Sequence, residues 1–371
     1  MIEKLRTWIE IDQKALLGNT RSFLQLIPES TIFMAVIKSN AYGHGLVETA
    51  QVLSSVKDRE IWFGLDSITE ALALRKKGIK NKLLVLGQTL PSRLSEAHKN
   101  KITVTVSNFS LLAEIGKTAV CPRFFLKIDS GMHRQGFMED DLFRLLANLK
   151  ISRLAPLGIY THLASPTDPR HKKFTESQFK KFLSAVKILQ ENGFKNLIKS
   201  ASSSGGVLGH PETALDMVRV GIGLYGYPPS LELKSKISLR PVLSWKTRIS
   251  ELKEVPASEF VGYGLTAKTQ RPTRIAVLPV GYWHGYDRRL SDCGEILAGG
   301  KRAKIIGRVS MDMIVADVTE IAKIKEGDEA VLLGRQGQEE IWADDIARQM
   351  QTGYHYEFLT RLNPLIKRFL V

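Results

Sequence analysis

The sequence predicts an α/β protein in which a (β/α)8 TIM barrel is followed by a mostly-β C-terminal domain. Its 371 residues exceed what one hydrophobic core usually organises, so a large barrel with an added domain fits the length. From residue 12 to about 225, short β-branched runs alternate with stretches of helical period, as in βαβ units. Beyond about residue 230, strand-like runs are separated by Gly, Pro and Asp turns, with little helix between them.

Eight apolar runs in the first region have the length and composition of buried strands. They cover 31–38, 61–66, 83–87, 102–106, 123–129, 156–162, 197–202 and 217–222. A first helix is predicted over 12–27, and stretches of helical period lie between the strands, such as 45–56, 68–78, 108–119 and 139–149. Eight strands with interleaved helices in this length favour a closed (β/α)8 barrel over an open doubly wound sheet.

The C-terminal region reads as a separate β domain. Its strand-like runs cover 244–255, 274–282, 301–310, 313–321 and 329–336. We therefore place the barrel in residues 1–230 and the β domain in residues 231–371, with 228–236 as the linker between them. We also expect the first residues, roughly 1–10, to pack on the β domain.

Composition excludes several classes of protein. Hydrophobic residues make up 43% and charged residues 25% of the chain, which is ordinary for a folded globular protein. The formal net charge is +15, but the basic residues are spread along helix-like segments such as 172–190. Because they form no cluster, we expect no nucleic-acid partner.

The cysteines and the N-terminal segment indicate a reducing compartment. Cys121 and Cys293 are far apart and outside any CxxC pattern, so they predict neither a disulfide framework nor a metal site. The segment 1–12 is charged and has no apolar core of signal-peptide length, and no stretch approaches a membrane span. We expect a cytoplasmic protein without a membrane partner or a metal.

In a barrel, the C-terminal ends of the strands form the mouth where active sites are built. Several polar residues fall at such ends in this sequence: Lys38, Lys127, Asp129, Arg134, His162, the Ser/Gly run 200–206 and Arg219. Each has an ordinary structural explanation when taken singly. Lys38 fits a lysine extending out of the barrel, the Ser/Gly run fits a plain loop, and an isolated histidine or arginine fits a structural contact.

Taken together, these residues indicate a cofactor site. A partly desolvated lysine favours its neutral amine, the form that attacks a carbonyl group. The run 200–206 offers hydroxyls and backbone N–H groups that suit a phosphate. An amine nucleophile, a phosphate site and two fixed cations, Arg134 and Arg219, suggest a phosphorylated aldehyde, namely pyridoxal 5'-phosphate.

The motifs around these residues also resemble a known family. Seven blocks occur in order along nearly the whole chain: AVIKSNAYGHG, LKIDSGMHRQGF, THLASPTD, MVRVGIGLYG, GYGLTAKTQ, LPVGYWHGY and GRVSMD. The sequence is similar in these blocks to bacterial alanine racemases, which are pyridoxal-phosphate enzymes of fold type III. The resemblance implies that L- and D-alanine are interconverted by two bases, with D-alanine supplying peptidoglycan, in a homodimer whose active sites draw on both chains.

The resemblance assigns a role to individual residues. Lys38 would attach the cofactor and act as one base, and Tyr263 of the partner subunit would act as the other. The cofactor-binding residues would be Lys38, Tyr42, His162, Ser204, Arg219, Gly221, Ile222 and Tyr356, with Tyr354 as an alternative to Tyr356. The substrate-binding residues would be Arg134 and Met311, supported by Lys127, Asp312 and Tyr282.

Some points stay open within the resemblance. The lysine matching Lys127 is carbamylated in many family members, and we leave its state here undecided. Because a tyrosine phenol is ordinarily protonated at neutral pH, we expect His162 and Arg219 to supply positive charge to Tyr263. The usual GYADGY reads GYWHGY here, with His284, and the usual VCMDQ reads VSMDM, with Ser310 and Met313. These changes concern substrate access and rate.

Other functions are compatible with parts of this pattern. A racemase of different or broader range, acting on serine, lysine or arginine, would keep the same chemistry. A decarboxylase of basic amino acids shares the architecture but needs cysteine and acidic motifs that we do not find. A non-catalytic cofactor carrier would resemble the barrel alone.

Overall fold

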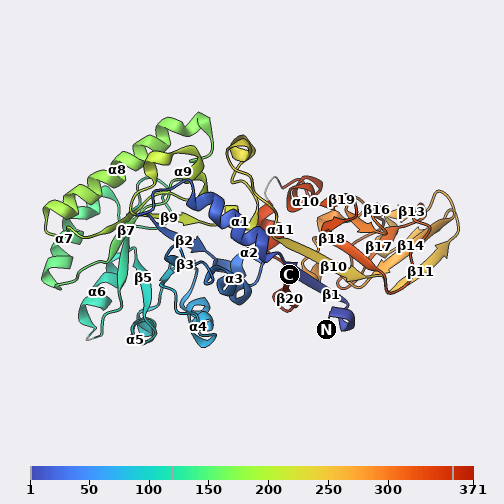
Figure 1. The fold of residues 1–371 in the computed structure, drawn as a ribbon, viewed down its shortest axis with the longest axis horizontal. Coiled ribbons are helices and arrows are strands. Elements are labelled where there is room, and N and C mark those ends of the chain that lie inside the picture. The colour runs from blue at the N-terminus through green and yellow to red at the C-terminus, as the bar shows by residue number, and fades with distance from the viewer. Residues whose placement is uncertain (1, 119, 353–354) are drawn as a thin grey trace. The chain divides into compact units, whose positions relative to one another are not determined.

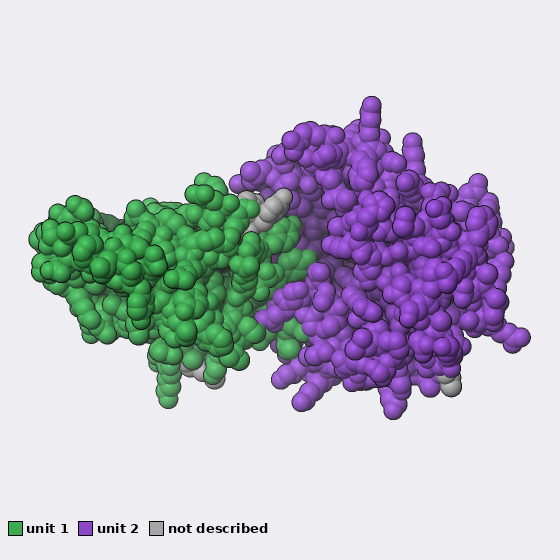
Figure 2. Space-filling model, turned by 180° about the vertical axis from the view of Figure 1, so that it is seen from behind, with its two compact units in different colours: residues 1–13, 42–48, 241–371 green, residues 14–41, 49–240 purple. Residues whose placement is uncertain are grey.

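The computed structural model describes residues 2–118, 120–352 and 355–371. Its chain divides into two compact units, coloured separately in Figure 2. One contains residues 14–41 and 49–240, and we call it the barrel unit. The other contains residues 1–13, 42–48 and 241–371, and we call it the sheet unit.

The barrel unit contains the predicted parallel sheet (Figure 1). Within the described residues its eight strands follow the order β8-β7-β6-β5-β4-β3-β2-β9. They are β2 (Ile32–Val36), β3 (Ile61–Leu65), β4 (Leu83–Val85), β5 (Ile102–Val106), β6 (Phe124–Lys127), β7 (Gly158–Tyr160), β8 (Ile198–Ser200) and β9 (Met217–Val220). An isolated bridge between Ser203 and Arg219 joins the two ends of this order. The predicted (β/α)8 barrel is therefore confirmed, with each strand inside its predicted run.

Helices follow most barrel strands, as the helical periodicity predicts. They are α3 (Leu46–Leu53), α4 (Ile68–Lys76), α5 (Leu94–Lys99), α6 (Phe109–Lys117), α7 (Leu142–Ile151), α8 (Lys172–Glu191) and α9 (Ser204–Gly209), and α1 (Gln13–Leu24) precedes the first strand. The segment labelled α2 (Lys38–Tyr42) is a left-handed turn and not a regular helix. Side-chain caps fix where two of them begin, because Ser67 accepts from the Glu70 N–H and Asn108 accepts from the Leu111 N–H.

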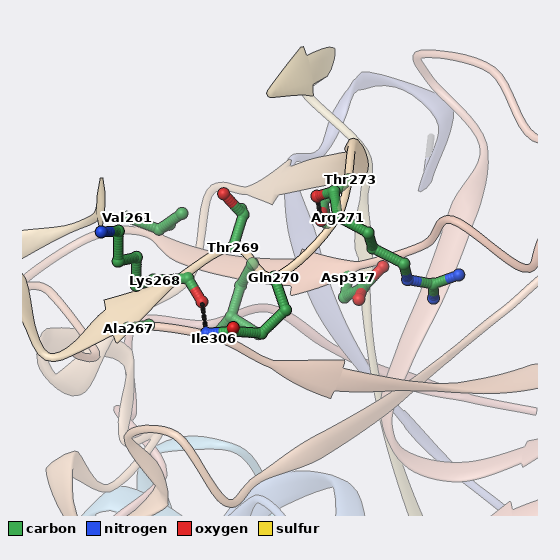
Figure 3. A pocket seen from close by; sticks show the side chains of 9 residues that line it. All are labelled: Val261, Ala267, Lys268, Thr269, Gln270, Arg271, Thr273, Ile306 and Asp317. Carbon is green, nitrogen blue, oxygen red and sulfur yellow. Dashed lines mark hydrogen bonds between the residues drawn. The ribbon is translucent and has the colours of Figure 1, made fainter. Parts of the chain in front are cut away.

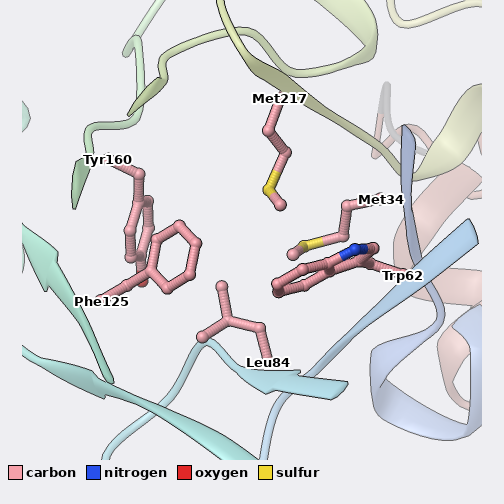
Figure 4. Packing of buried hydrophobic residues seen from close by; sticks show 6 residues of the cluster. All are labelled: Met34, Trp62, Leu84, Phe125, Tyr160 and Met217. Carbon is pink, nitrogen blue, oxygen red and sulfur yellow. The ribbon is translucent and has the colours of Figure 1, made fainter. Parts of the chain in front are cut away.

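Large side chains fill the barrel interior (Figure 4). The cluster contains one residue from each of six strands: Met34, Trp62, Leu84, Phe125, Tyr160 and Met217. Aromatic edges meet aromatic faces within it, at centroid distances of 6.2 Å for Trp62 and Phe125 and 6.4 Å for Phe125 and Tyr160. The barrel interior is thus filled by side chains, so a ligand site is expected at its mouth.

The sheet unit is built mainly from antiparallel strands. They are β1 (Thr7–Ile11), β10 (Leu243–Arg248), β11 (Glu251–Val255), β12 (Phe260–Val261), β13 (Ala267–Lys268), β14 (Thr273–Leu278), β15 (Glu295–Ala298), β16 (Lys301–Ile305), β17 (Ile314–Asp317), β18 (Glu329–Gln336), β19 (Glu339–Ile341) and β20 (Arg368–Leu370). Two helices accompany them, α10 (Ala343–Gln349) and α11 (His355–Thr360). Strand β1 lies between β10, to which it is antiparallel, and β20, to which it is parallel.

The segment after Lys38 has an unusual backbone. Ser39, Asn40, Ala41 and Tyr42 all have φ between 53° and 56°, a run of left-handed conformation without glycine. Such a conformation costs about 1–2 kcal/mol for each residue with a side chain. Contacts with other parts of the chain must therefore stabilise this turn. The residues that follow it, 42–48, belong to the sheet unit.

Gly43, directly after this turn, packs closely against other backbone. It has φ +87°, a Cβ added to it would lie 2.0 Å from the Leu359 carbonyl oxygen, and its own carbonyl accepts from Arg368 Nε at 2.9 Å. Gly300 has a similar φ of +76° but nothing within 4 Å of its added Cβ. An alanine substitution at each glycine would lose free energy of unfolding through the left-handed backbone, but only at Gly43 would a steric clash add to that loss.

We predict that Gly43→Ala destabilises the protein much more than Gly300→Ala. Both variants force an alanine into a left-handed conformation, but only the first pushes it into backbone that cannot move aside. The additional loss of about 2 kcal/mol corresponds to a melting temperature about 4–8 °C lower for Gly43→Ala than for Gly300→Ala. Thermal unfolding followed by circular dichroism measures this, and equal melting temperatures would contradict the clash.

Candidate active site

Lys38 lies at the mouth of the barrel, two residues beyond the end of β2. The carboxylate of Glu70 fixes the adjoining loops, because it accepts from the Asn40 N–H at 3.1 Å and the Asp66 N–H at 2.8 Å. Lys38 Nζ lies 3.8 Å from Asp66 Oδ1, and 39% of the Lys38 side chain is exposed. The amine is therefore within reach of a ligand and has a carboxylate beside it.

Arg219 lies on β9, the neighbour of β2, and is almost completely buried. Its guanidinium donates to Ser200 Oγ at 2.5 Å and to the carbonyls of Thr161 at 2.6 Å and Ala201 at 3.2 Å. It also lies 5.1 Å from the ring centroid of Tyr160. Burial lowers the pKa of Arg219 to about 10, so the group keeps its charge at neutral pH.

His162 lies beside Arg219, with its Nδ1 3.4 Å from the guanidinium. Burial lowers the pKa of His162 to about 3, and the charges of Arg219, Lys127 and Arg134 add to this effect. The imidazole is therefore neutral at pH 7, with Nδ1 as the acceptor towards Arg219. The expectation that His162 supplies positive charge to Tyr263 is wrong, and Arg219 alone of that pair carries a charge.

Lys127 ends β6 and is buried at the same mouth. Its Nζ donates to Gln135 Oε1 at 3.1 Å and lies 5.4 Å from the Tyr160 ring centroid, and Gln135 Nε2 in turn donates to Ser107 Oγ at 3.2 Å. Burial and then the neighbouring arginines lower the pKa of Lys127 to about 8. About one tenth of this amine is thus neutral at pH 7.

A tight loop after β6 sets the backbone of Arg134. The two oxygens of Asp129 accept hydrogen bonds of 2.9–3.0 Å from the N–H groups of Gly131, Met132, His133 and Arg134. Burial acts to raise the pKa of Asp129, but these donors outweigh it and the pKa is below its ordinary value. Asp129 is thus an ionised anchor that fixes the start of the Arg134 side chain.

Ser204, Gly221 and Ile222 come together next to β9. Ser204 begins α9 and is buried, and its Oγ accepts from the Gly221 N–H at 3.0 Å. The hydroxyl hydrogen of Ser204 is therefore available to another acceptor. Ile222 begins a short 3-10 turn directly after Gly221.

The remaining predicted cofactor residues belong to the sheet unit. The rings of Tyr42 and Tyr356 lie 6.2 Å apart between centroids, inclined at 50°. Burial raises the pKa of Tyr42 to about 12, so its phenol is a hydrogen-bond donor at neutral pH. Tyr354, the alternative to Tyr356, lies outside the described residues.

Tyr263 and Met311, which the resemblance assigns to the partner subunit's site, are also in the sheet unit, as are the supporting residues Tyr282 and Asp312, and all four are exposed. The exposed fractions are 72% for Tyr263, 44% for Tyr282 and 56% for Met311, and Asp312 is exposed as well. The Tyr282 N–H donates to the Ser310 carbonyl at 3.0 Å, which brings Tyr282 beside Met311 and Asp312.

Three residues of the mouth were missed at the level of sequence. Tyr160 lies between the charges of Lys127 and Arg219, and the alternation of strand side chains could have placed it on the same face as His162. Asp66 occupies the end of β3, where the same reasoning that selected Lys38 applies. Gln135 gives no such signal, because its contact with Lys127 depends on the loop held by Asp129.

The site combines a reactive amine with an excess of positive charge. The cations that lower the pKa of His162 are Arg219, Lys127, Arg134 and Lys38. The carboxylates described above are Asp66 and Asp129, so the four cations are only partly balanced. Such a mouth favours an anionic ligand, and Lys38 can condense with a carbonyl group carried by that ligand. A phosphorylated aldehyde fits this set of donors.

Two family models match this chain. They describe the alanine racemase N-terminal domain, over residues 11–229, and the alanine racemase C-terminal domain, over residues 242–370. The chain belongs to the alanine racemase family. It is accordingly an enzyme of the isomerase class, as the motifs predict.

Relatives and solved structures agree with this membership across the whole chain. The alanine racemases of Leptospira interrogans and Halothermothrix orenii are 35% and 36% identical, over 100% and 98% of this chain and 97% and 96% of theirs. The alanine racemase structure from Clostridium difficile 630 superposes with a TM-score of 0.92, 31% identity and coverage of 99% and 96%. The structure from Bacillus anthracis, with bound L-Ala-P, gives 0.91, 30%, 99% and 95%.

In this member of the alanine racemase family, one cavity lies apart from the predicted site residues. A cavity of 490 Å³ in the sheet unit is lined in part by Lys268, Gln270 and Arg271, and none of the predicted site residues lines it (Figure 3). Gln270 Nε2 donates to the Lys268 carbonyl at its wall. Among the described helices, none has the length and apolar character required to cross a bilayer.

Proposed function

We propose that this protein interconverts L-alanine and D-alanine with pyridoxal 5'-phosphate by a two-base mechanism, and that the D-alanine supplies peptidoglycan. The observation that carries the proposal is the placement of Lys38 just beyond β2, the strand that pairs with the Arg219 strand β9, with Ser204 and Gly221 hydrogen-bonded at the end of β9. An amine, a charged guanidinium and phosphate donors thus share one end of the barrel. The family membership supports the same reaction.

The donor set fits this cofactor. Lys38 would hold its aldehyde carbon, Arg219 its ring nitrogen, and Ser204, Gly221 and Ile222 its phosphate. The neutral His162 would hold the guanidinium of Arg219 in place by accepting a hydrogen bond from it. Tyr42 and Tyr356, in the sheet unit, are assigned to the phosphate on the family resemblance. When bound, the cofactor supplies an electron-accepting ring that stabilises negative charge at the α-carbon of the amino acid.

Arg219 determines what happens to the ring nitrogen. A guanidinium with a pKa of about 10 is charged at neutral pH and donates hydrogen bonds only. Opposite this guanidinium, the ring nitrogen of a bound cofactor would stay without a proton, and the ring would then supply a weaker electron acceptor. Arg219 would thereby favour racemisation over transamination.

Inversion requires proton transfer on two opposite faces, and we assign these transfers to Lys38 and to Tyr263 of the partner subunit. The exposed position of Tyr263 supports this assignment, because 72% of its side chain is open to a second chain. Large exposed apolar residues accompany it in the sheet unit, among them Phe260, Leu265, Trp283, Met311 and Met313. We therefore propose a homodimer with shared active sites.

The substrate carboxylate is assigned to Arg134 and to the backbone N–H of the partner's Met311. Asp129 fixes the backbone of Arg134, and Lys127 acts on it electrostatically. With a pKa of about 8, Lys127 has a neutral fraction that can react with CO2 to form a carbamate. Such a carbamate would place an anion beside Arg134, and 13C NMR with labelled bicarbonate tests its presence.

A broader amino-acid range is the second candidate, favoured by the changes at His284, Ser310 and Met313 near the partner-facing loops. The purified protein should absorb in the visible range from its bound cofactor and should abolish the circular dichroism of L-alanine. The same measurement on serine, lysine and arginine defines the range. A colourless protein inactive on all four amino acids would overturn the proposed function.

The two bases predict an asymmetric result for Tyr263→Phe. This variant should lose α-hydrogen exchange with deuterium for one enantiomer of alanine by about 10²–10⁴-fold and keep it for the other. Proton NMR of each enantiomer in D2O measures the two rates separately. The exchange rate of the other enantiomer in the same variant is the internal control; equal losses for both enantiomers in Tyr263→Phe would argue against the roles.

Shared active sites predict that two inactive variants complement each other. Mixing Lys38→Ala with Tyr263→Phe in equal amounts, after subunit exchange, should restore about a quarter of the wild-type activity, because half the dimers carry one intact site of two. Each variant mixed with itself is the control. No recovery despite exchange, verified by mass spectrometry of differently tagged chains, would show that the two residues do not meet across chains.

A further inference from the structure

A short turn at residues 281–285 is packed backbone to backbone against the loop that carries Met311. The Tyr282 N–H donates to the Ser310 carbonyl and the Trp283 N–H donates to the Met311 carbonyl, both at 3.0 Å. A Cβ added to Gly281 would lie 2.2 Å from the Ser310 oxygen. The position of the Met311 peptide therefore depends on the shape of this turn.

The side chain of His284 closes the turn. Its Nδ1 accepts from the Gly281 N–H at 3.2 Å, and its side chain is 14% exposed. The other side of the turn is also held, because the Asn363 N–H donates to the His284 carbonyl at 3.1 Å. Since Nδ1 can accept only when it carries no proton, the turn as observed requires a neutral imidazole.

Two charged groups act on this imidazole. Asp312, on the Met311 loop, has its Oδ1 3.9 Å from Nδ1, and Arg6 acts from the N-terminal segment. Burial lowers the pKa of His284 and outweighs Asp312, which raises it, while Arg6 lowers it further. The direction agrees with the geometry, in which the neutral form holds the turn.

We propose that His284 is a positioning residue that holds the Met311 loop in place for the substrate carboxylate while its imidazole is neutral. The inference rests on the proposed function, which assigns the Met311 N–H to that carboxylate. Protonation of His284 removes the acceptor for the Gly281 N–H and offers Nδ1 to Asp312 instead. The turn then loses its closing hydrogen bond, and the loop loses its support.

The sign of the pH dependence follows from the lowered pKa. The neutral form is favoured by the fold, so its contribution is complete above the ordinary histidine pKa of about 6.5 and is lost as the pH falls through the lowered pKa of His284. One hydrogen bond of this kind corresponds to a change of about two- to tenfold. We therefore expect KM for alanine to rise by that factor as the pH falls from neutral through that lowered pKa, with kcat changed less than KM.

Two variants separate the acceptor from its titration. His284→Asn keeps an acceptor oxygen near the place of Nδ1 but does not titrate, whereas His284→Ala removes the acceptor. Hydrogen exchange of peptides covering 281–285 and 310–314, corrected for intrinsic pH dependence, is measured from pH 5 to pH 8 on the holoenzyme. In wild type the protection should fall about two- to tenfold towards pH 5, in His284→Asn it should stay constant, and in His284→Ala it should be low throughout.

Several results would overturn the inference. Protection that falls towards pH 5 in His284→Asn as in wild type would remove His284 as the titrating group, and normal protection in His284→Ala would remove it as the acceptor. An unchanged KM despite the expected exchange would break the link to the substrate. The expected exchange in a protein that does not racemise alanine would contradict the proposed function alone, so the two failures are distinguishable.

Discussion

The buried guanidinium of Arg219 is the interaction on which the barrel mouth depends. A charge removed from water costs several kcal/mol unless hydrogen bonds compensate it, so its partners must stay in place. Those partners, Ser200, Thr161 and Ala201, lie at or just beyond the ends of β7 and β8. Because β8 and β9 are the two ends of the strand order, Arg219 on β9 also fastens the seam of the barrel.

The charges at the mouth are coupled to one another through this fixed cation. Arg219 and its neighbours keep His162 neutral and lower the pKa of Lys127. By linkage, an anion bound at the mouth raises both pKa values towards their ordinary range, and the protonated forms in turn favour the anion. The excess of positive charge at the mouth therefore favours a phosphorylated group.

Much of the barrel could be predicted from sequence because parallel strands that are buried on both faces consist of nearly continuous apolar residues. Lys38, Arg134 and Arg219 stood out because Lys38 ends such a run, Arg134 follows one and Arg219 lies within one. The protonation state of His162 could not be predicted, because it depends on burial and on four cations contributed by separate strands and loops. The contact between Lys127 and Gln135 was equally hidden, since it depends on a loop that four backbone donors to Asp129 hold in place.

The sheet unit was less predictable, because its order depends on pairings between distant parts of the chain. Strand β1 at residues 7–11 pairs with strands that begin at 243 and 368, and β15 was not recognised as a strand. The left-handed run at Ser39–Tyr42 contains no glycine, so the sequence does not predict it. Its conformation is selected by contacts of the following residues, such as Gly43 with Leu359, and not by local preference.

The assignment of residues 42–48 to the sheet unit has a consequence for how the protein is made. The ribosome releases these residues, and strand β1 before them, long before strands β10 and β20 that complete their unit. The barrel unit can close once residue 240 has emerged, while the early parts of the sheet unit wait with unpaired strand edges. Nascent chains therefore expose an aggregation-prone strand for most of translation, and the final pairing of β20 is the step that conceals it.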